Sequence, residues 1–228
     1  RMPMSGLAQE YAGRLLAEVD GITAAREHFI AASELEPGRA AIISMDLARL
    51  DGLAGDFHHA EARVEALLAD PRPAMDQLGH VIRARLAAWR GDVTEMMESV
   101  SMFTSQINES AARMATALSV LHALGTLDPD AWQWFLAQFE GGDQPQRQHL
   151  MTLQVLAEGA LALERTEPAL QIVIASAERG LVDHVWLTRC PLFAKLEGDP
   201  RFHAVREEVA RRAATVLGAF RHHSQTGR

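Results

Sequence analysis

The chain has 228 residues, of which 48% are hydrophobic and 23% charged, values ordinary for a folded protein with material for a core. Its formal net charge of −8 disfavours general attraction to a nucleic-acid backbone or to an anionic membrane surface, so we expect neither partner. No stretch reaches the roughly 20 apolar residues of a membrane span, and no segment typical of a signal peptide opens the chain.

Helix-forming residues run through nearly the whole chain. Alanine, leucine, glutamate and arginine fill long segments, and alternating runs of β-branched residues are missing. Turn signals recur at intervals, at Asp20-Gly21, Glu36-Pro37-Gly38, Gly55-Asp56, Asp70-Pro71, Gly91-Asp92, Asp128-Pro129 and Gly141-Gly142. They divide the chain into helices of about 12 to 18 residues with short connections, as helical hairpins require.

The first predicted hairpin carries small residues at set intervals. Gly13 lies twelve residues before Ala25. Phe29, Ala32 and Pro37 then follow at intervals of four, three and five residues. A glycine or alanine at the crossing lets two helices approach, and a larger residue fills the groove beside it.

The same register continues more loosely along the chain. The matching residues are Leu47, Ala48, Gly55 and Ala60 in the second hairpin, Ala84, Gly91 and Met96 in the third, and Leu156, Ala157, Ala169 and Val173 in the fifth. The fourth hairpin is degenerate, because Asp128-Pro129 begins its second helix and aromatic residues crowd it (Trp132, Trp134 and Phe135). Gly55 and Gly91 are 36 residues apart, and Gly91 and Gly125 are 34 apart.

These positions and this spacing resemble the tetratricopeptide (TPR) repeat, whose period is about 34 residues. The resemblance implies an all-α fold, a right-handed superhelix of about five helical hairpins with a C-terminal capping helix. We assign residues 1–180 to the repeat array, residues 181–220 to a capping segment and terminal helix, and residues 221–228 to a flexible tail.

The C-terminal part has a resemblance of its own, over roughly residues 180 to 210. Its motifs are Trp186-Leu187, Pro191-Leu192-Phe193 and Asp199-Pro200-Arg201-Phe202. It is similar to the closing segment of TPR regions in bacterial serine/threonine kinases, nucleotide cyclases and winged-helix regulators. The resemblance implies that its apolar side chains plug the open end of the array, and that the chain is a regulatory part of a bacterial signalling protein. Asp199 suits an N-cap and Pro200 the first turn of the last helix.

Motifs for catalysis or cofactor binding are missing from the sequence. It contains no Gly-x-x-x-x-Gly-Lys-Ser/Thr loop, no Gly-x-Gly-x-x-Gly, no Gly-x-Ser-x-Gly and no His-Glu-x-x-His. The adjacent pairs His58-His59 and His222-His223 point about 100° apart on a helix and suit no shared metal. Cys190 is the only cysteine, which excludes an internal disulfide, fits a reducing cytoplasm and predicts a small buried residue. We therefore expect no enzyme, no cofactor and no metal.

Arginines recur at one position of the register. In TPR proteins the first helix of each hairpin lines the concave surface, and the residue after the small residue points into it. The resemblance places Arg14, Arg49 and Arg85 there, with Trp89 as a neighbour on the same surface. Ser119 and Glu158 take this position in the last two hairpins.

Two interpretations of these arginines stay open. A groove that carries them could hold a carboxylate, an acidic peptide or a phosphopeptide, because guanidinium groups match such groups with two hydrogen bonds. Alternatively, each arginine pairs with a carboxylate of its own surface, such as Glu10, Glu18 or Asp46.

The sequence therefore predicts a module that binds a protein or peptide, or another domain of the same polypeptide. A small-molecule sensor predicts instead one enclosed pocket. An enzyme predicts converging carboxylates or histidines with shifted pKa values, and a structural dimerisation array predicts an exposed apolar strip.

Overall fold

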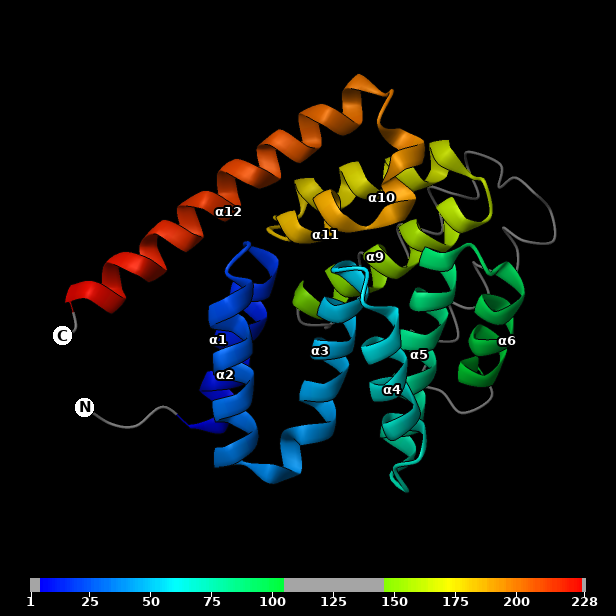
Figure 1. Cartoon of the computed structure of the whole chain (residues 1–228). Helices are drawn as coiled ribbons and strands as arrows, with labels where there is room; N and C mark the ends of the chain where they lie inside the picture. The colour runs from blue at the N-terminus through cyan, green and yellow to red at the C-terminus, as the bar shows by residue number, and fades with distance from the viewer. Residues whose placement is uncertain (1–4, 105–145, 227–228) are drawn as a thin grey trace. The chain divides into compact units, whose positions relative to one another are not determined.

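The computed structural model describes residues 5–104 and 146–226, and every secondary-structure element in these ranges is helical (Figure 1). In chain order they are α1 (Gly6–Glu18), α2 (Ile22–Leu35), the 3₁₀ helix η1 (Pro37–Arg39), α3 (Ala40–Leu53), α4 (Phe57–Leu68), α5 (Pro73–Arg90), α6 (Val93–Thr104), α9 (Gln146–Ala162), α10 (Thr166–Glu178), α11 (His184–Arg189), the 3₁₀ helix η2 (Pro191–Leu196) and α12 (Pro200–Thr226). The predicted all-α class is confirmed for these residues. The predicted fourth hairpin, with Ser119 and the aromatic residues Trp132, Trp134 and Phe135, lies outside them.

The chain divides into two compact units. Unit 1 comprises Arg1–Ile82, Val182–Cys190 and Arg206–Arg228, and unit 2 comprises Arg83–Leu181 and Pro191–Val205. The segments after Leu181 alternate between the two units.

Helices that are neighbours in sequence pack in pairs within each unit. The pairs α1–α2 and α3–α4 lie in unit 1, and the pair α9–α10 lies in unit 2. Gly13 of α1 shows why a small residue is needed at the crossing. A Cβ atom on Gly13 would lie 2.8 Å from two ring carbons of Phe29, which is fully buried.

The small-residue register recurs in structure as well as in sequence. Its first member is buried at all four described places, Gly13, Ala48, Ala84 and Ala157. The residue twelve positions later is no more than 2% exposed, whether it is Ala25, Ala60, Met96 or Ala169. Each described repeat therefore buries the same two positions, and Met96 fits despite its size.

The turn between the paired helices also repeats. The residue seven positions after the first small residue has a positive φ every time, 66° at Asp20, 82° at Gly55, 78° at Gly91 and 60° at Glu164. A left-handed residue of this kind ends an α-helix. In two of the next helices an aspartate caps the start, because Asp56 accepts from the backbone N–H of His59 at 3.2 Å and Asp92 from that of Glu95 at 2.9 Å.

The predicted closing segment buries its aromatic side chains. Trp186 of α11 is fully buried in unit 1, while Phe193 and Phe202 stack in unit 2 with ring centroids 5.1 Å apart. Pro200 begins α12, and the Asp199 carboxylate accepts from the backbone N–H of Arg201 at 2.8 Å. The predicted start of the last helix is thus confirmed.

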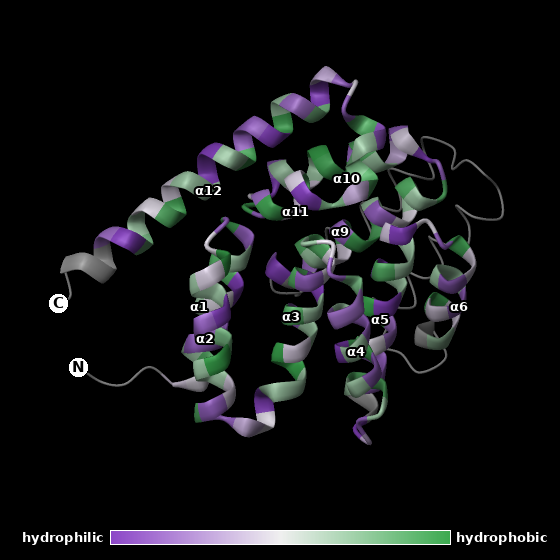
Figure 2. Ribbon diagram, in the orientation of Figure 1, coloured by the Kyte–Doolittle hydropathy of each residue, from purple (hydrophilic) through white to green (hydrophobic). Residues whose placement is uncertain are grey.

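The last helix is longer than the sequence suggested. α12 continues to Thr226, so residues 221–226 of the segment that we expected to form a flexible tail are helical. Glycine and proline are both absent between Gly218 and the end of α12. Two apolar residues near this end, Leu217 and Phe220, pack against the core of unit 1 that contains Leu16 and Phe29. Figure 2 shows hydrophobic residues interleaved with hydrophilic ones along this helix.

We predict opposite effects for one chemical change at two helical glycines. Gly13→Ala should lower the free energy of unfolding by about 1–2 kcal/mol, because displacing Phe29 costs more than the helix propensity of alanine returns. Gly218→Ala should raise it by about 0.5–1 kcal/mol, because nothing lies within 4 Å of the added methyl group. Urea denaturation followed by circular dichroism measures both, and a neutral or stabilising Gly13→Ala would contradict this view of the crossing.

A second prediction concerns His28 of α2. Its ring packs edge-on against the Phe220 ring, with 5.8 Å between the ring centroids. Its Nδ1 donates to the side-chain oxygen of Gln9, and burial lowers the pKa of the imidazole. The unfolded chain, with an ordinary histidine pKa of about 6.5, then binds protons more readily than the folded one. The free energy of unfolding should fall as pH drops from 7.5 to 5.5, and fall less in His28→Asn. The exposed His58→Asn serves as the control, and equal pH slopes for wild type and His28→Asn would count against the idea.

Candidate functional site

The candidate site consists of the side chains that follow the first small residue of each hairpin. These are Arg14, Arg49, Arg85 and Glu158. Arg14 and Arg49 lie in unit 1, and Arg85 and Glu158 lie in unit 2. The structure gives every one of these four an ionic partner within its own unit.

Arg14 lies between two carboxylates of unit 1. Its Nε donates to Asp46 of α3 at 2.7 Å, and its Nη1 lies 2.9 Å from Glu10 of the same helix. Glu10 is buried and also accepts from Arg39 of η1, which raises the pKa of the Arg39 guanidinium. The second interpretation of the arginines foresaw both partners of Arg14, and their side chains tie α1 to α3.

Arg49 holds the start of a distant segment. Its Nη2 donates to Asp183, whose other carboxylate oxygen accepts from the backbone N–H of Trp186 at 3.0 Å and so caps α11. Asp183 is almost fully buried, and the Arg49 side chain is mostly so. One arginine therefore fixes α11 to α3 across 134 residues of sequence.

Arg85 and Trp89 are interior residues of unit 2. Arg85 is 3% exposed and donates through Nε and Nη2 to both oxygens of Glu158, at 2.8 and 2.7 Å. Its guanidinium carbon lies 5.4 Å from the centroid of the Trp89 ring. Arginine and glutamate thus occupy the equivalent register position on α5 and α9 and pair with each other. A ligand would have to displace Glu158 to reach Arg85.

One buried carboxylate escaped the sequence analysis. Asp51 of α3 accepts from Arg26 of α2 and, at 2.8 Å, from Arg63 of α4. It therefore ties both neighbouring helices to α3. A signal was present, because Arg26 follows the small residue Ala25 directly, but the register alone does not show which carboxylate it meets.

Helix α1, which carries Arg14, also exposes two large side chains. Leu7 and Tyr11, one turn apart on α1, are 41% and 53% exposed. The Arg14 guanidinium carbon lies 6.0 Å from the centroid of the Tyr11 ring, and Arg14 reaches Asp46. We call the four residues Leu7, Tyr11, Arg14 and Asp46 the first-helix surface.

Some hydrogen-bond donors remain available near this surface. Arg14 engages its Nε and Nη1, and Arg49 its Nη2, with partners in the described part of the chain. Neither guanidinium makes a further hydrogen bond or ion pair with the described residues. An added carboxylate could accept from Arg14 Nη2 without breaking its existing pairs.

The histidines and the cysteine singled out from the sequence, and the carboxyl groups with lowered pKa values, lie outside this arrangement. Both His58 and His59 are exposed, and His59 bonds with Asp56 and lowers the pKa of that carboxyl. Cys190 is buried, as expected. Arg72 lowers the pKa of the Asp70 carboxyl to about 2, which keeps it ionised at neutral pH.

Two features are absent from the described ranges, a metal-binding cluster and a membrane-spanning helix. Residues 5–104 and 146–226 hold no group of three or more histidine, cysteine, aspartate or glutamate side chains arranged to bind a metal. Within the same ranges, no helix is both long and apolar enough to cross a membrane.

Comparisons with known proteins found no relative. The chain matches no protein-family model, and it matches neither a curated protein nor a solved structure at a significant level. Its functional interpretation therefore rests on its own residues.

The buried pair in unit 2 yields a prediction of stability. Glu158→Gln should lower the free energy of unfolding by about 3–5 kcal/mol, because it removes the negative charge that Arg85 meets in the interior of unit 2. The double variant Arg85→Met/Glu158→Leu should recover most of this loss.

Glu167→Gln is the matched control, because Glu167 is half exposed in its pair with Arg201 and its loss should cost less than about 1 kcal/mol. Chemical denaturation of all variants gives the comparison. A Glu158→Gln variant as stable as wild type would show that the pair does not hold α5 and α9 together.

Proposed function

We propose that the chain is a TPR-like helical-repeat module that binds a protein or peptide segment and has no catalysis of its own. The observation that carries this proposal is the repeated hairpin. The same two positions are buried and the same left-handed turn recurs in all four described repeats. Such arrays present first helices side by side as an extended binding surface.

The first-helix surface is the place where we propose that the segment binds. Leu7 and Tyr11 expose apolar and aromatic area next to Arg14, and aromatic residues with arginine are frequent energetic centres of interfaces. The available N–H groups of Arg14 and Arg49 favour a segment that carries a carboxylate. The bound segment would then be acidic with an apolar residue beside the acidic one.

A regulatory role in a bacterial signalling protein is part of this proposal. It is supported by the similarity of residues 180 to 210 to the closing segments described above. The partner would then be another protein or another domain of the same polypeptide.

A displayed library of random peptides tests the proposal. Wild-type protein should enrich a family of peptides that share acidic and apolar positions. Tyr11→Ser should weaken their binding at least tenfold, or about 1.4 kcal/mol, because the exposed ring provides contact area. Fluorescence anisotropy with a synthetic peptide from the enriched family measures the change.

Ile30→Ser is the matched control, because Ile30 is similarly exposed but lies on α2. Equal loss of binding in Tyr11→Ser and Ile30→Ser would remove the first-helix surface from the proposal. Failure of wild-type protein to enrich any peptide family would count against a peptide-binding role. Concentration-dependent dimers in sedimentation, abolished by Tyr11→Ser, would assign this surface to self-association instead.

A further inference from the structure

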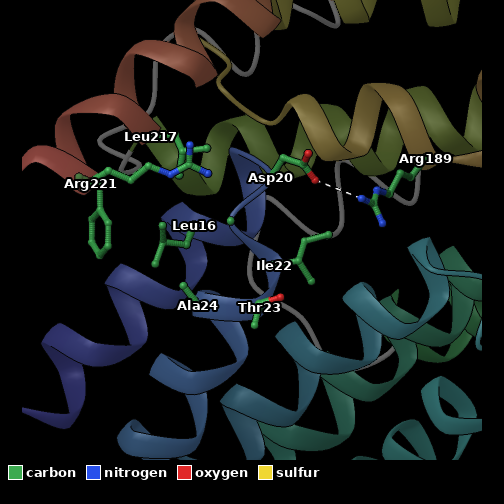
Figure 3. A pocket seen from close by; sticks show the side chains of 10 residues that line it. Leu16, Asp20, Ile22, Thr23, Ala24, Arg189, Leu217 and Arg221 are labelled. Atoms are coloured by element: carbon green, nitrogen blue, oxygen red, sulfur yellow. Dashed lines mark hydrogen bonds and ion pairs between the residues drawn. The ribbon is translucent and has the colours of Figure 1, made fainter. Parts of the chain in front are cut away.

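A surface cavity of about 580 Å³ lies in unit 1, apart from the first-helix surface (Figure 3). Its walls come from the turn between α1 and α2, the beginning of α2, the last residue of α11 and the last turns of α12. This volume falls in the range of about 300–1,000 Å³ that small-molecule sites occupy.

Most of the cavity wall is apolar. Leu16 and Ile22 contribute from the first hairpin, and Leu217 and Phe220 contribute from α12. Leu16 belongs to the buried core, while Leu217 and Phe220 pack against that core and are only partly buried. The cavity therefore offers apolar area that a ligand could cover.

Two arginines and one carboxylate supply the charge. Arg189 pairs with Asp20 at 3.1 Å, and both side chains are about half exposed. Arg221 is exposed and has no ionic partner among the residues that the structure describes. In Figure 3 the Arg221 side chain extends from α12 toward Asp20, and Arg189 meets Asp20 from the other side. The three charges sum to +1.

The beginning of α2 adds to this positive character. Gly21, its N-cap, makes no side-chain capping bond, and Ile22, Thr23 and Ala24 of the first turn line the cavity. Backbone N–H groups at the start of a helix favour an anion. Alone this would not define a site, but here it coincides with a cavity and an unpaired guanidinium.

We propose that this cavity binds a ligand with an apolar body and a single carboxylate. The carboxylate accepts two hydrogen bonds from Arg221, and the body covers Leu16, Leu217 and Phe220. A single negative charge matches the net charge of +1. A dianionic phosphate would find only one guanidinium without an ionic partner, and the carboxylate of Asp20 would repel it. The ligand is either a free hydrophobic acid or the C-terminal carboxylate of a peptide with an apolar last residue.

Isothermal titration calorimetry on the whole chain tests this site with octanoate, 1-octanol and octyl phosphate. Octanoate should bind saturably and at least tenfold more tightly than 1-octanol, and octyl phosphate should bind no more tightly than octanoate. Arg221→Gln should weaken octanoate binding at least tenfold, a loss of about 1.4 kcal/mol. Arg211→Gln, an exposed arginine of α12 that pairs with Glu208 outside the cavity, should leave it unchanged within twofold.

A second arm distinguishes the two sources of the carboxylate. A tetrapeptide ending in Leu-Phe with a free carboxylate is compared with the same peptide as its C-terminal amide. Saturable binding of octanoate or of the free-acid peptide, lost in Arg221→Gln, supports the site, and the tighter of the two assigns the source. No saturable binding of either probe, or equal binding by Arg221→Gln and wild type, overturns the proposal.

The outcome is separable from that of the peptide-display experiment. Tyr11 of the first-helix surface does not line the cavity, and Arg221 does not belong to that surface. Octanoate binding should therefore be unaffected by Tyr11→Ser, and loss of octanoate binding in Tyr11→Ser would overturn the assignment to this cavity.

Discussion

Two helices of a hairpin can pack closely only where the side chains between them are small, and this close approach organises everything else in the described structure. Gly13 leaves no room for a Cβ atom against the ring of Phe29, and Ala25 is fully buried beside it. The crossing fixes where the first helix must end, which explains why a left-handed residue follows at the same interval in all four described hairpins. Side chains that flank the crossing are thereby brought to equivalent positions in each repeat.

Arginine uses these equivalent positions to join the hairpins. Lys195 is the only lysine among the 22 basic residues, so nearly all positive charge is carried by guanidinium groups. Their forked donors can bridge two carboxylates or grip one at both oxygens, which suits ties between helices better than an ammonium group does. Asp51 shows the reverse arrangement, in which one carboxylate accepts hydrogen bonds from two arginines, Arg26 and Arg63. These ion pairs thus follow from the repeated positions of the arginines along the hairpins.

The arginines differ in whether their guanidinium groups are already occupied by carboxylates of the same unit. Guanidinium groups that are buried with their partners, as Arg85 is with Glu158, join helices inside a unit. Groups that keep unused donors and exposed neighbours, around Tyr11 and around Arg221, are the places where we propose that ligands bind. α1 contributes to both places, with Tyr11 at the first-helix surface and Leu16 behind the cavity.

The sequence by itself determined the all-helical class and the register of the described hairpins, because small residues, turn residues and caps act over a few neighbours along the chain. Gly55 and Gly91 predicted two of the left-handed turns and Asp20-Gly21 marked the turn of a third, whereas nothing in the sequence around Glu164 predicted a left-handed residue there. Only the tertiary structure decided the partners of the arginines, since Arg49 meets Asp183 from 134 residues away and Arg85 meets Glu158 from 73 away. It also decided that α12 reaches Thr226 and that the end of α12 forms a wall of the cavity, because those contacts depend on which apolar surfaces meet after folding and not on the local pattern.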